Sequence, residues 1–391
     1  MSSTPDLPST PREWQNLVGK KRLIGSTIHT ARLSSASTIE EDQYLLFRVL
    51  WRIHPIEQFD LKRLDLAAWE TKANEHLANY SSWKTYCDGL VDRTVYESTF
   101  ALAHYFQLQA ADTEDETSAP NVVVTPIASR TRSKIAAAGR QLARTHLQTP
   151  TKSTGALPDD SESESESELE LEDEEEGDLT DIESPLVSRS PAPEEIRHLL
   201  FQQTKDEQIV NTALVNFLSA LTLHAGLANH WTLHRKSFKA NFTNASFEAR
   251  TDGYLEDEKP GGRVRALVEV KAALRIKKRK PICMQEAAQM VAWIRSHPDR
   301  GGWLNLPGRR IHVSQDHHQI YIVIAEFTDG YIDYLEKGAP SDVYMTMHEY
   351  GPWETDSVRH MKNVATILVA FVLRAAADRE AEEARSKQST A

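Results

Sequence analysis

The first third of the chain carries apolar residues at the spacing of helices. Between residues 13 and 109 they recur every three or four positions, which places their side chains on one face of a helix. The residues that make this pattern are Leu45, Leu46, Val49, Leu50, Ile53, Trp69, Val91, Val95, Leu102 and Phe106. The pattern predicts a separate helical module over residues 12–110, to which the sequence assigns no function.

Residues 111–193 contain too few apolar residues to form a packed core. They include the run SESESESELELEDEEEGD, whose like charges oppose a helix and keep the chain extended. We expect a disordered acidic linker between two folded parts. The run suits a solvated spacer, but it also suits phosphorylation of its serines by acid-directed kinases and the binding of a basic protein partner.

After residue 193, helical and strand-like patterns alternate. A capping box, Thr204-Lys-Asp-Glu207, opens the first amphipathic helix. The elements predicted after it are strands at Trp231–Phe242, Ser246–Leu255 and Val264–Ala273, a helix at Ile282–Ser296, strands at His318–Phe327 and Tyr331–Leu335 joined by a hairpin at Asp329-Gly330, and a helix at Asp356–Arg385. This order predicts an α+β or α/β domain over residues 194–385 with an αβββαβ core.

Composition and charge indicate the cellular compartment of the protein. The 391-residue chain has a formal net charge of −12, and Asp159–Glu183 alone holds fifteen acidic residues and no basic ones, so the remainder is slightly basic. Two cysteines, Cys87 and Cys283, are too few for a disulfide framework or a Cys-x-x-Cys zinc site, which favours a reducing, intracellular compartment. Residues 1–20 do not resemble a secretory signal, and the longest apolar run, Val364–Leu373, is about half a membrane span, so we expect no membrane association.

The predicted strand Leu267-Val-Glu269-Val-Lys271 presents an acid and a base on one face. Alternate residues of a strand project to opposite faces, so Glu269 and Lys271 lie side by side, roughly 7 Å apart. Asp252 comes near the end of the preceding strand, and Gly253 after it permits a sharp bend. If Asp252 reaches the same edge of the sheet, two carboxylates and one ammonium group converge.

Such a group of side chains suits hydrolysis of a phosphodiester bond. Two carboxylates and a main-chain carbonyl can hold Mg²⁺ or Mn²⁺, which activates water and polarises the phosphate. We therefore expect Asp252 and Glu269 to bind the metal. We expect Lys271 to orient the attacking water, to help deprotonate it or to stabilise charge in the transition state. An ordinary salt-bridged strand would give the same Glu-x-Lys spacing without any chemistry.

These motifs resemble those of the PD-(D/E)XK nuclease superfamily over about residues 203–335. The chain looks most similar to a fungal-type branch of nuclease-like proteins, through its motifs at Ala249–Gly253, Val268–Lys271 and Gln285–Met290. The resemblance implies a restriction-endonuclease-like αβββαβ core and magnesium-dependent hydrolysis of nucleic acid. The site residues that it implies are Asp252, Glu269, Lys271 and Gln285.

The remaining family positions match less completely. Gln285 and Gln289 are four residues apart on one face of the expected helix, and the resemblance favours Gln285 as the residue that points back to the site. The family's proline before the aspartate is Thr251 here. An acidic residue on the first helix corresponds to Glu207, which the capping box explains equally well.

A basic segment follows the Glu-x-Lys strand directly. Its cations, expected on a loop at the rim of the site, are Arg275, Lys277, Lys278, Arg279 and Lys280. We expect them to contact backbone phosphates, with DNA favoured over RNA, so that binding weakens steeply with salt. The same segment fits a nuclear-import signal, which favours the nucleus over the cytoplasm, and basic loops are often only solvated.

Neither a histidine-rich segment nor Cys283 is assigned a chemical role. His312, His317 and His318 lie near Asp316 in an expected loop, without the spaced ligand set of a transition-metal site. Cys283 lacks a His-Asp partner set, so no nucleophilic role is assigned to it.

The alternative to a nuclease is a catalytically inactive nuclease-fold protein that acts as a platform for binding nucleic acid or another protein.

Overall fold

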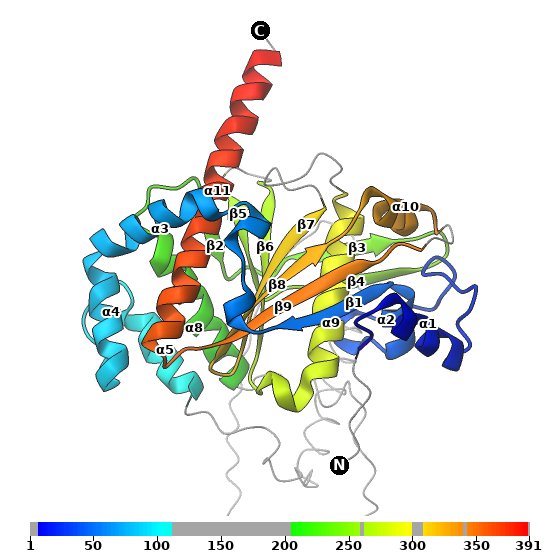
Figure 1. Ribbon diagram of the computed structural model, residues 1–391, viewed down its shortest axis with the longest axis horizontal. Coiled ribbons are helices and arrows are strands. Elements are labelled where there is room, and N and C mark those ends of the chain that lie inside the picture. Colours follow the sequence, from blue (N-terminus) through cyan, green and yellow to red (C-terminus); the bar gives the residue numbers. More distant parts are fainter. Residues whose placement is uncertain (1–6, 112–204, 259–261, 299–307, 339–341, 390–391) are drawn as a thin grey trace, which may run out of the picture. The chain divides into compact units, whose positions relative to one another are not determined.

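The computed structural model describes residues 7–111, 205–258, 262–298, 308–338 and 342–389. Its main sheet is mixed and seven-stranded, in the order β1-β9-β8-β7-β6-β5-β2 (Figure 1). These strands are β1 (Val49–His54), β2 (Asn229–Thr232), β5 (Gly253–Asp257), β6 (Val264–Lys271), β7 (Arg309–Asp316), β8 (Gln319–Glu326) and β9 (Met345–Glu354). Strand β1 pairs with β9, and β6 with β7, in parallel; the other neighbours are antiparallel. A separate antiparallel ribbon is formed by β3 (Ser237–Asn241) and β4 (Ser246–Arg250).

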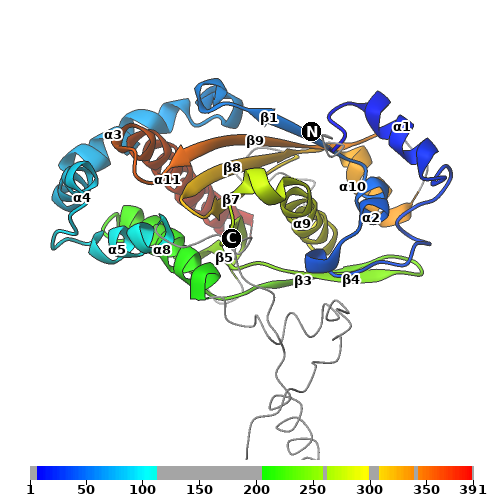
Figure 2. The same cartoon turned by 90° about the horizontal axis from the view of Figure 1, so that it is seen from below.

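Helices cover both faces of the sheet (Figure 2). One face packs against α3 (Ala67–Asn79), α4 (Ser81–Asp92), α5 (Ala101–Ala111), α8 (Lys205–Thr222) and α11 (Val358–Ser389). The other packs against α1 (Pro11–Lys20), α2 (Glu41–Leu46), α9 (Arg275–Ser296), α10 (Asp329–Lys337) and the β3–β4 ribbon. The described residues therefore form a mixed α and β fold with a hydrophobic core on each side of one sheet.

Alternation along β6 divides its side chains between the two cores. Val268 and Val270 belong to the core beneath α8 and α11, whereas Leu267 belongs to the core beneath α9. Because residues two apart share a face of a strand, Glu269 and Lys271 project on the same side as Leu267. This side carries the polar site described below.

The prediction of a separate N-terminal helical module is wrong. Val49, Leu50 and Trp51 are consecutive buried residues of β1, which forms an edge of the main sheet beside β9. In a continuous run of buried residues, apolar positions show neither the period of a helix nor the alternation of a half-buried strand. The sequence pattern therefore did not separate this strand from the helix that precedes it. Helix α2 is capped by Phe47, and Arg48, at φ 56° in the left-handed region, turns the chain into β1. The N-terminal residues thus share one compact unit with residues 205–389.

Two of the predicted strands are each broken in two. The segment Trp231–Phe242 gives β2 and β3, and the segment Ser246–Leu255 gives β4 and β5, so each contributes to both the main sheet and the ribbon. The second break comes just before Gly253. A Cβ atom at Gly253 would lie 2.6 Å from the main-chain oxygen of Thr232, so only glycine allows this close approach.

The predicted hairpin at Asp329-Gly330 is also wrong, because this segment is helix α10. Its buried residues, Tyr331, Ile332, Tyr334 and Leu335, have helical spacing. The sequence interpretation missed β7 and β9 entirely. It correctly located α8, β6, β8 and α11, and it began α9 seven residues too late, beyond a kink at Lys278 and beyond Pro281.

By its length and composition, helix α11 is long and apolar enough to cross a membrane. Of its most apolar window, 67% is buried inside the protein. Met361, Val364 and Leu368 pack in the core beneath the sheet, so in the described fold α11 serves as a core helix. The acidic linker predicted at 111–193 lies outside the described residues, except that Ala111 ends α5.

Candidate active site

The pairing of β5 with β6 brings Asp252 and Glu269 together. Gly253 pairs with Val268 in this antiparallel register, so the residue before Gly253 faces the residue after Val268. The main-chain N–H of Asp252 donates to the oxygen of Val268 at 3.0 Å, and the N–H of Val270 donates to Asp252 Oδ2 at 3.2 Å. Both acidic residues are buried, with exposed fractions of 9% for Asp252 and 2% for Glu269.

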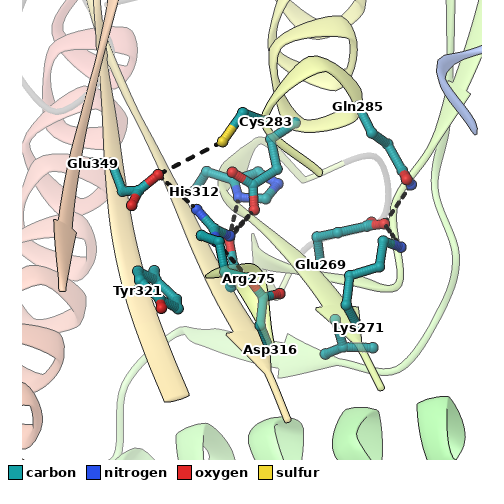
Figure 3. A network of polar contacts seen from close by, with 12 residues as sticks. Glu269, Lys271, Arg275, Cys283, Gln285, His312, Asp316, Tyr321 and Glu349 are labelled. Carbon is teal, nitrogen blue, oxygen red and sulfur yellow. Dashed lines mark hydrogen bonds and ion pairs between the residues drawn. The ribbon is translucent and has the colours of Figure 1, made fainter. Parts of the chain in front are cut away.

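Three side chains hold the carboxylate of Glu269. Lys271 Nζ lies 2.7 Å from Oε1, and Gln285 Nε2 donates to the same oxygen (Figure 3). Gln289 Nε2 donates to Oε2 at 2.6 Å. The structure therefore brings together all four residues expected at the site, and Gln289 contacts the same carboxylate as the favoured Gln285.

The first turns of α8 contact the other side of the site. Glu207 Oε1 lies 3.2 Å from Lys271 Nζ, so the acidic residue matched to the first helix does reach the lysine. Asn211, one turn later, donates from Nδ2 to the main-chain oxygen of Asp252 at 3.2 Å. Asn211 Oδ1 is buried and accepts no hydrogen bond from the described residues. Arg235 lies 3.4 Å from Asp252 Oδ1.

Burial raises the pKa values of both carboxyl groups, and a nearby carboxylate adds to each shift: Asp252 for Glu269, and Glu207 for Asp252. Burial, followed by the charge of Asp252, raises the pKa of Glu269 to about 8. Burial also raises the pKa of Asp252, against the opposing effect of Lys271. Burial alone would lower the pKa of Lys271, but the carboxylates of Glu269, Glu207 and Asp252 outweigh it, so the pKa of Lys271 is raised and the ammonium group stays charged.

The stability of the metal-free protein should report the titration of Glu269. Its pKa of about 8 in the folded protein lies above the ordinary value of about 4.3, so the folded state holds the proton more tightly. The stabilisation is complete below about pH 4 and is lost as the pH rises to about 8. With EDTA present, the free energy of unfolding of the wild type should therefore fall relative to that of Glu269→Gln between about pH 5 and pH 8. Parallel pH profiles in urea unfolding would contradict the raised pKa.

The oxygen donors at the site fit a divalent cation. Carboxylates are the side chains that Mg²⁺ and Mn²⁺ prefer, and a cation between Asp252 and Glu269 would favour the charged forms that burial disfavours. Among the described residues, no group of three or more His, Cys, Asp or Glu side chains is placed to hold a metal. Two carboxylates would therefore need further oxygen ligands from the main chain, water or the unpartnered Asn211 Oδ1.

The prediction that Arg275 lies on an exposed loop and contacts phosphate is wrong. Arg275 is the first residue of α9, and its side chain is completely buried. Its guanidinium group forms an ion pair with Glu286. It also pairs with Asp316 and Glu349 (Figure 3). It also lies over the ring of Tyr321, with its central carbon 4.2 Å from the ring centroid. This arginine therefore joins α9 to β7, β8 and β9 instead of facing a ligand.

The other four cations of the basic segment lie on the first turns of α9. Arg279 pairs with Glu349 at 2.7 Å, and Lys280 pairs with Glu41 at 2.7 Å. Lys277 and Lys278 are exposed. The expected basic rim is therefore reduced to the four cations after Arg275, which lie on the kinked start of a helix and not on a loop.

Buried polar side chains connect Glu269 with the Arg275 ion pairs. Gln289 Oε1 lies 3.1 Å from His312 Nε2, and His312 Nδ1 lies 3.1 Å from Ser314 Oγ, which donates to Glu286 at 2.6 Å. Burial and the nearby Arg275 lower the pKa of His312 to about 3, so its ring is neutral.

The sequence interpretation placed His312 in a loop and gave it no part in the site. The structure places it on β7, where His312, Ser314 and Asp316 have the two-residue spacing of one strand face. That spacing was the signal that could have identified them.

Cys283 lies 3.7 Å from Glu349, and burial raises its pKa well above the ordinary value, which keeps the thiol protonated.

The chain matches no protein-family model, and it matches no curated protein sequence. The interpretation of the site therefore depends on its geometry and on the sequence motifs.

Proposed function

We propose that the protein hydrolyses phosphodiester bonds of nucleic acid with the help of Mg²⁺ or Mn²⁺, as PD-(D/E)XK nucleases do. The observation that carries this proposal is the convergence of Asp252, Glu269, Lys271 and Gln285 from three separate segments of the chain. The order α8, β2, β5, β6, α9 and β7, with the β3–β4 ribbon inserted, supports it because the resemblance implies an αβββαβ core.

Each side chain has a role that its contacts support. When bound, the metal would activate water and neutralise charge on the phosphate. Asp252 and Glu269 would hold the metal, and Gln285 and Gln289 would orient the Glu269 carboxylate through their amide groups. Lys271 places a charged ammonium group beside that carboxylate, where it can orient the attacking water or stabilise charge that develops on the phosphate.

A second candidate is a nuclease fold that binds nucleic acid or protein without cutting. It is favoured by the hydrogen bonds of Glu269, since both of its carboxylate oxygens already accept from protein side chains and are satisfied without a metal.

DNA as the favoured substrate, a basic protein partner for the acidic run and a nuclear location all stay predictions. Asp159–Glu183 lies outside the described residues.

Metal-dependent cleavage is the direct test. The purified protein should cut labelled DNA or RNA, single- or double-stranded, in Mg²⁺ or Mn²⁺ and not in EDTA. Asp252→Asn should cut at least about 100-fold more slowly, because it removes a charge that would hold the metal. Mg²⁺ should also raise the melting temperature of the wild type more than that of Asp252→Asn, which reports metal binding without activity.

Asp333→Asn is the matched control because Asp333 is on α10 and pairs with Lys337, away from the site. It should cut as fast as the wild type. Cleavage that persists in EDTA, or that Asp252→Asn leaves unchanged, would exclude the proposed role of the metal. Binding without cutting under every condition would favour the inactive platform.

A further inference from the structure

A groove of about 910 Å³ lies between the N-terminal segment, β1 and the start of α9. Its walls come from residues 7–20, 51–54 and 276–283, which are far apart in the sequence. The basic residues that line it are Lys20, Arg52, Lys277, Lys278, Arg279 and Lys280. A single acidic residue, Glu13, is part of the lining. The groove is therefore a strongly basic hollow that the sequence did not predict, because two of its walls come from the supposed separate module.

The acidic side chains at the groove are held by the protein's own groups. Glu13 accepts hydrogen bonds from the main-chain N–H of Ser9 at 2.8 Å and from its hydroxyl group at 2.9 Å, at the start of α1. Glu349, which is buried, pairs with Arg279, and Glu41 pairs with Lys280. These pairs position two of the cations on α9. Six of the lining side chains are thus basic and one is acidic, and two of the six, Arg279 and Lys280, are also paired with carboxylates.

We propose that this groove binds the phosphates of a nucleic-acid strand whose cleavage the candidate site performs. The inference rests on the proposed function. Helix α9 connects the two places: its first turns line the groove, and Gln285 and Gln289, farther along it, contact Glu269. A strand that follows the start of α9 would be held on the same helix that orients the catalytic carboxylate.

The chemistry of the lining favours nucleic acid over an acidic peptide. Cations on three separate segments match a ligand that repeats its negative charge, and a groove of about 910 Å³ holds far more than one phosphate. Ile53 and Ile276 also line the groove and are 56% and 80% exposed, so they offer apolar surface to sugars and bases. A glutamate-rich peptide has no comparable apolar group beside each charge.

The N-terminal wall provides the decisive test. Binding of a labelled 20-nucleotide single strand and of the corresponding duplex is measured over a salt series in EDTA, in the Asp252→Asn protein. Adding Lys20→Ala with Arg52→Ala should weaken binding at least about 10-fold at 100 mM salt and reduce the salt slope by roughly 1 to 2, as expected for two lost phosphate contacts. Lys20→Arg with Arg52→Lys keeps both charges and should retain the affinity.

Lys84→Ala with Lys362→Ala is the matched control. Both residues are exposed, on α4 and α11, which cover the face of the sheet opposite to α1 and α9. This pair should change affinity less than twofold. An equal effect of the groove pair and the control pair would overturn the inference. A 20-residue polyglutamate that binds as tightly as the oligonucleotide, and that loses affinity in the groove variant, would overturn it in favour of an acidic peptide. If the wild type binds through the groove but never cuts, the groove would be supported as the binding site for nucleic acid, and the proposed catalysis would be refuted.

Discussion

Replacing Lys271 by methionine should slow metal-dependent cleavage roughly 100-fold or more. Lys271 Nζ is 2.7 Å from Glu269 and 3.2 Å from Glu207, so the substitution removes the positive charge shared by these carboxylates. Methionine keeps most of the apolar stem, which limits the change in packing. Single-turnover cleavage at saturating protein concentration measures the chemical step without product release.

Two measurements separate a loss of chemistry from a loss of structure in this variant. Lys239→Met changes an exposed lysine on the ribbon and should leave the cleavage rate unchanged. The oligonucleotide affinity of Lys271→Met in EDTA should stay within a few-fold of wild type, because its groove is intact. A Lys271→Met protein that cuts at the wild-type rate would exclude the lysine from the mechanism.

Replacing Arg275 by methionine should reduce the free energy of unfolding by about 3–5 kcal/mol. The completely buried guanidinium group pairs with Glu286, Asp316 and Glu349. Its loss removes the cation that these carboxylates share, although Glu349 keeps its pair with Arg279. Urea unfolding at neutral pH measures the effect. Arg12→Met, an exposed change on α1, should stay within about 0.5 kcal/mol of wild type.

The pH dependence of the Arg275→Met effect identifies its cause. Burial raises the pKa of Asp316 to about 6 even with the arginine present, and removal of the cation would raise it further. A group whose folded pKa is raised gives more stability at low pH, so the deficit should shrink as the pH falls from 8 toward about 5. A deficit below about 1 kcal/mol, or one independent of pH, would contradict this account. If the variant does not fold, Asp316→Asn with the arginine intact tests the same network.

The candidate site could be predicted because it depends on two local periods. The two-residue period of a strand places Glu269 beside Lys271, and the four-residue spacing of a helix places Gln285 beside Gln289. Both pairs have these relations in the structure. Asp252 needed only the pairing of adjacent strands, which keeps the site within one short stretch of sequence.

The role of Arg275 could not be predicted in this way. Its three carboxylate partners are 11, 41 and 74 positions away, so a count of charges along the chain shows a basic run and nothing about burial. Strand β7 was missed for a related reason. His312, Ser314 and Asp316 are polar and fully buried, and a polar strand face that satisfies its groups with other side chains resembles a loop when only hydrophobicity is considered.

The pairing of β1 with β9 has a consequence for synthesis of the protein. Trp51 on β1 donates to Glu349 on β9, 298 positions later in the chain. At a translation rate of 5–20 residues per second, the apolar strand β1 would wait roughly 15 to 60 s on the ribosome before its partner is made. Contacts of such long range also slow folding after release. Expression conditions that slow translation or that limit chaperones should therefore reduce the soluble yield of this protein.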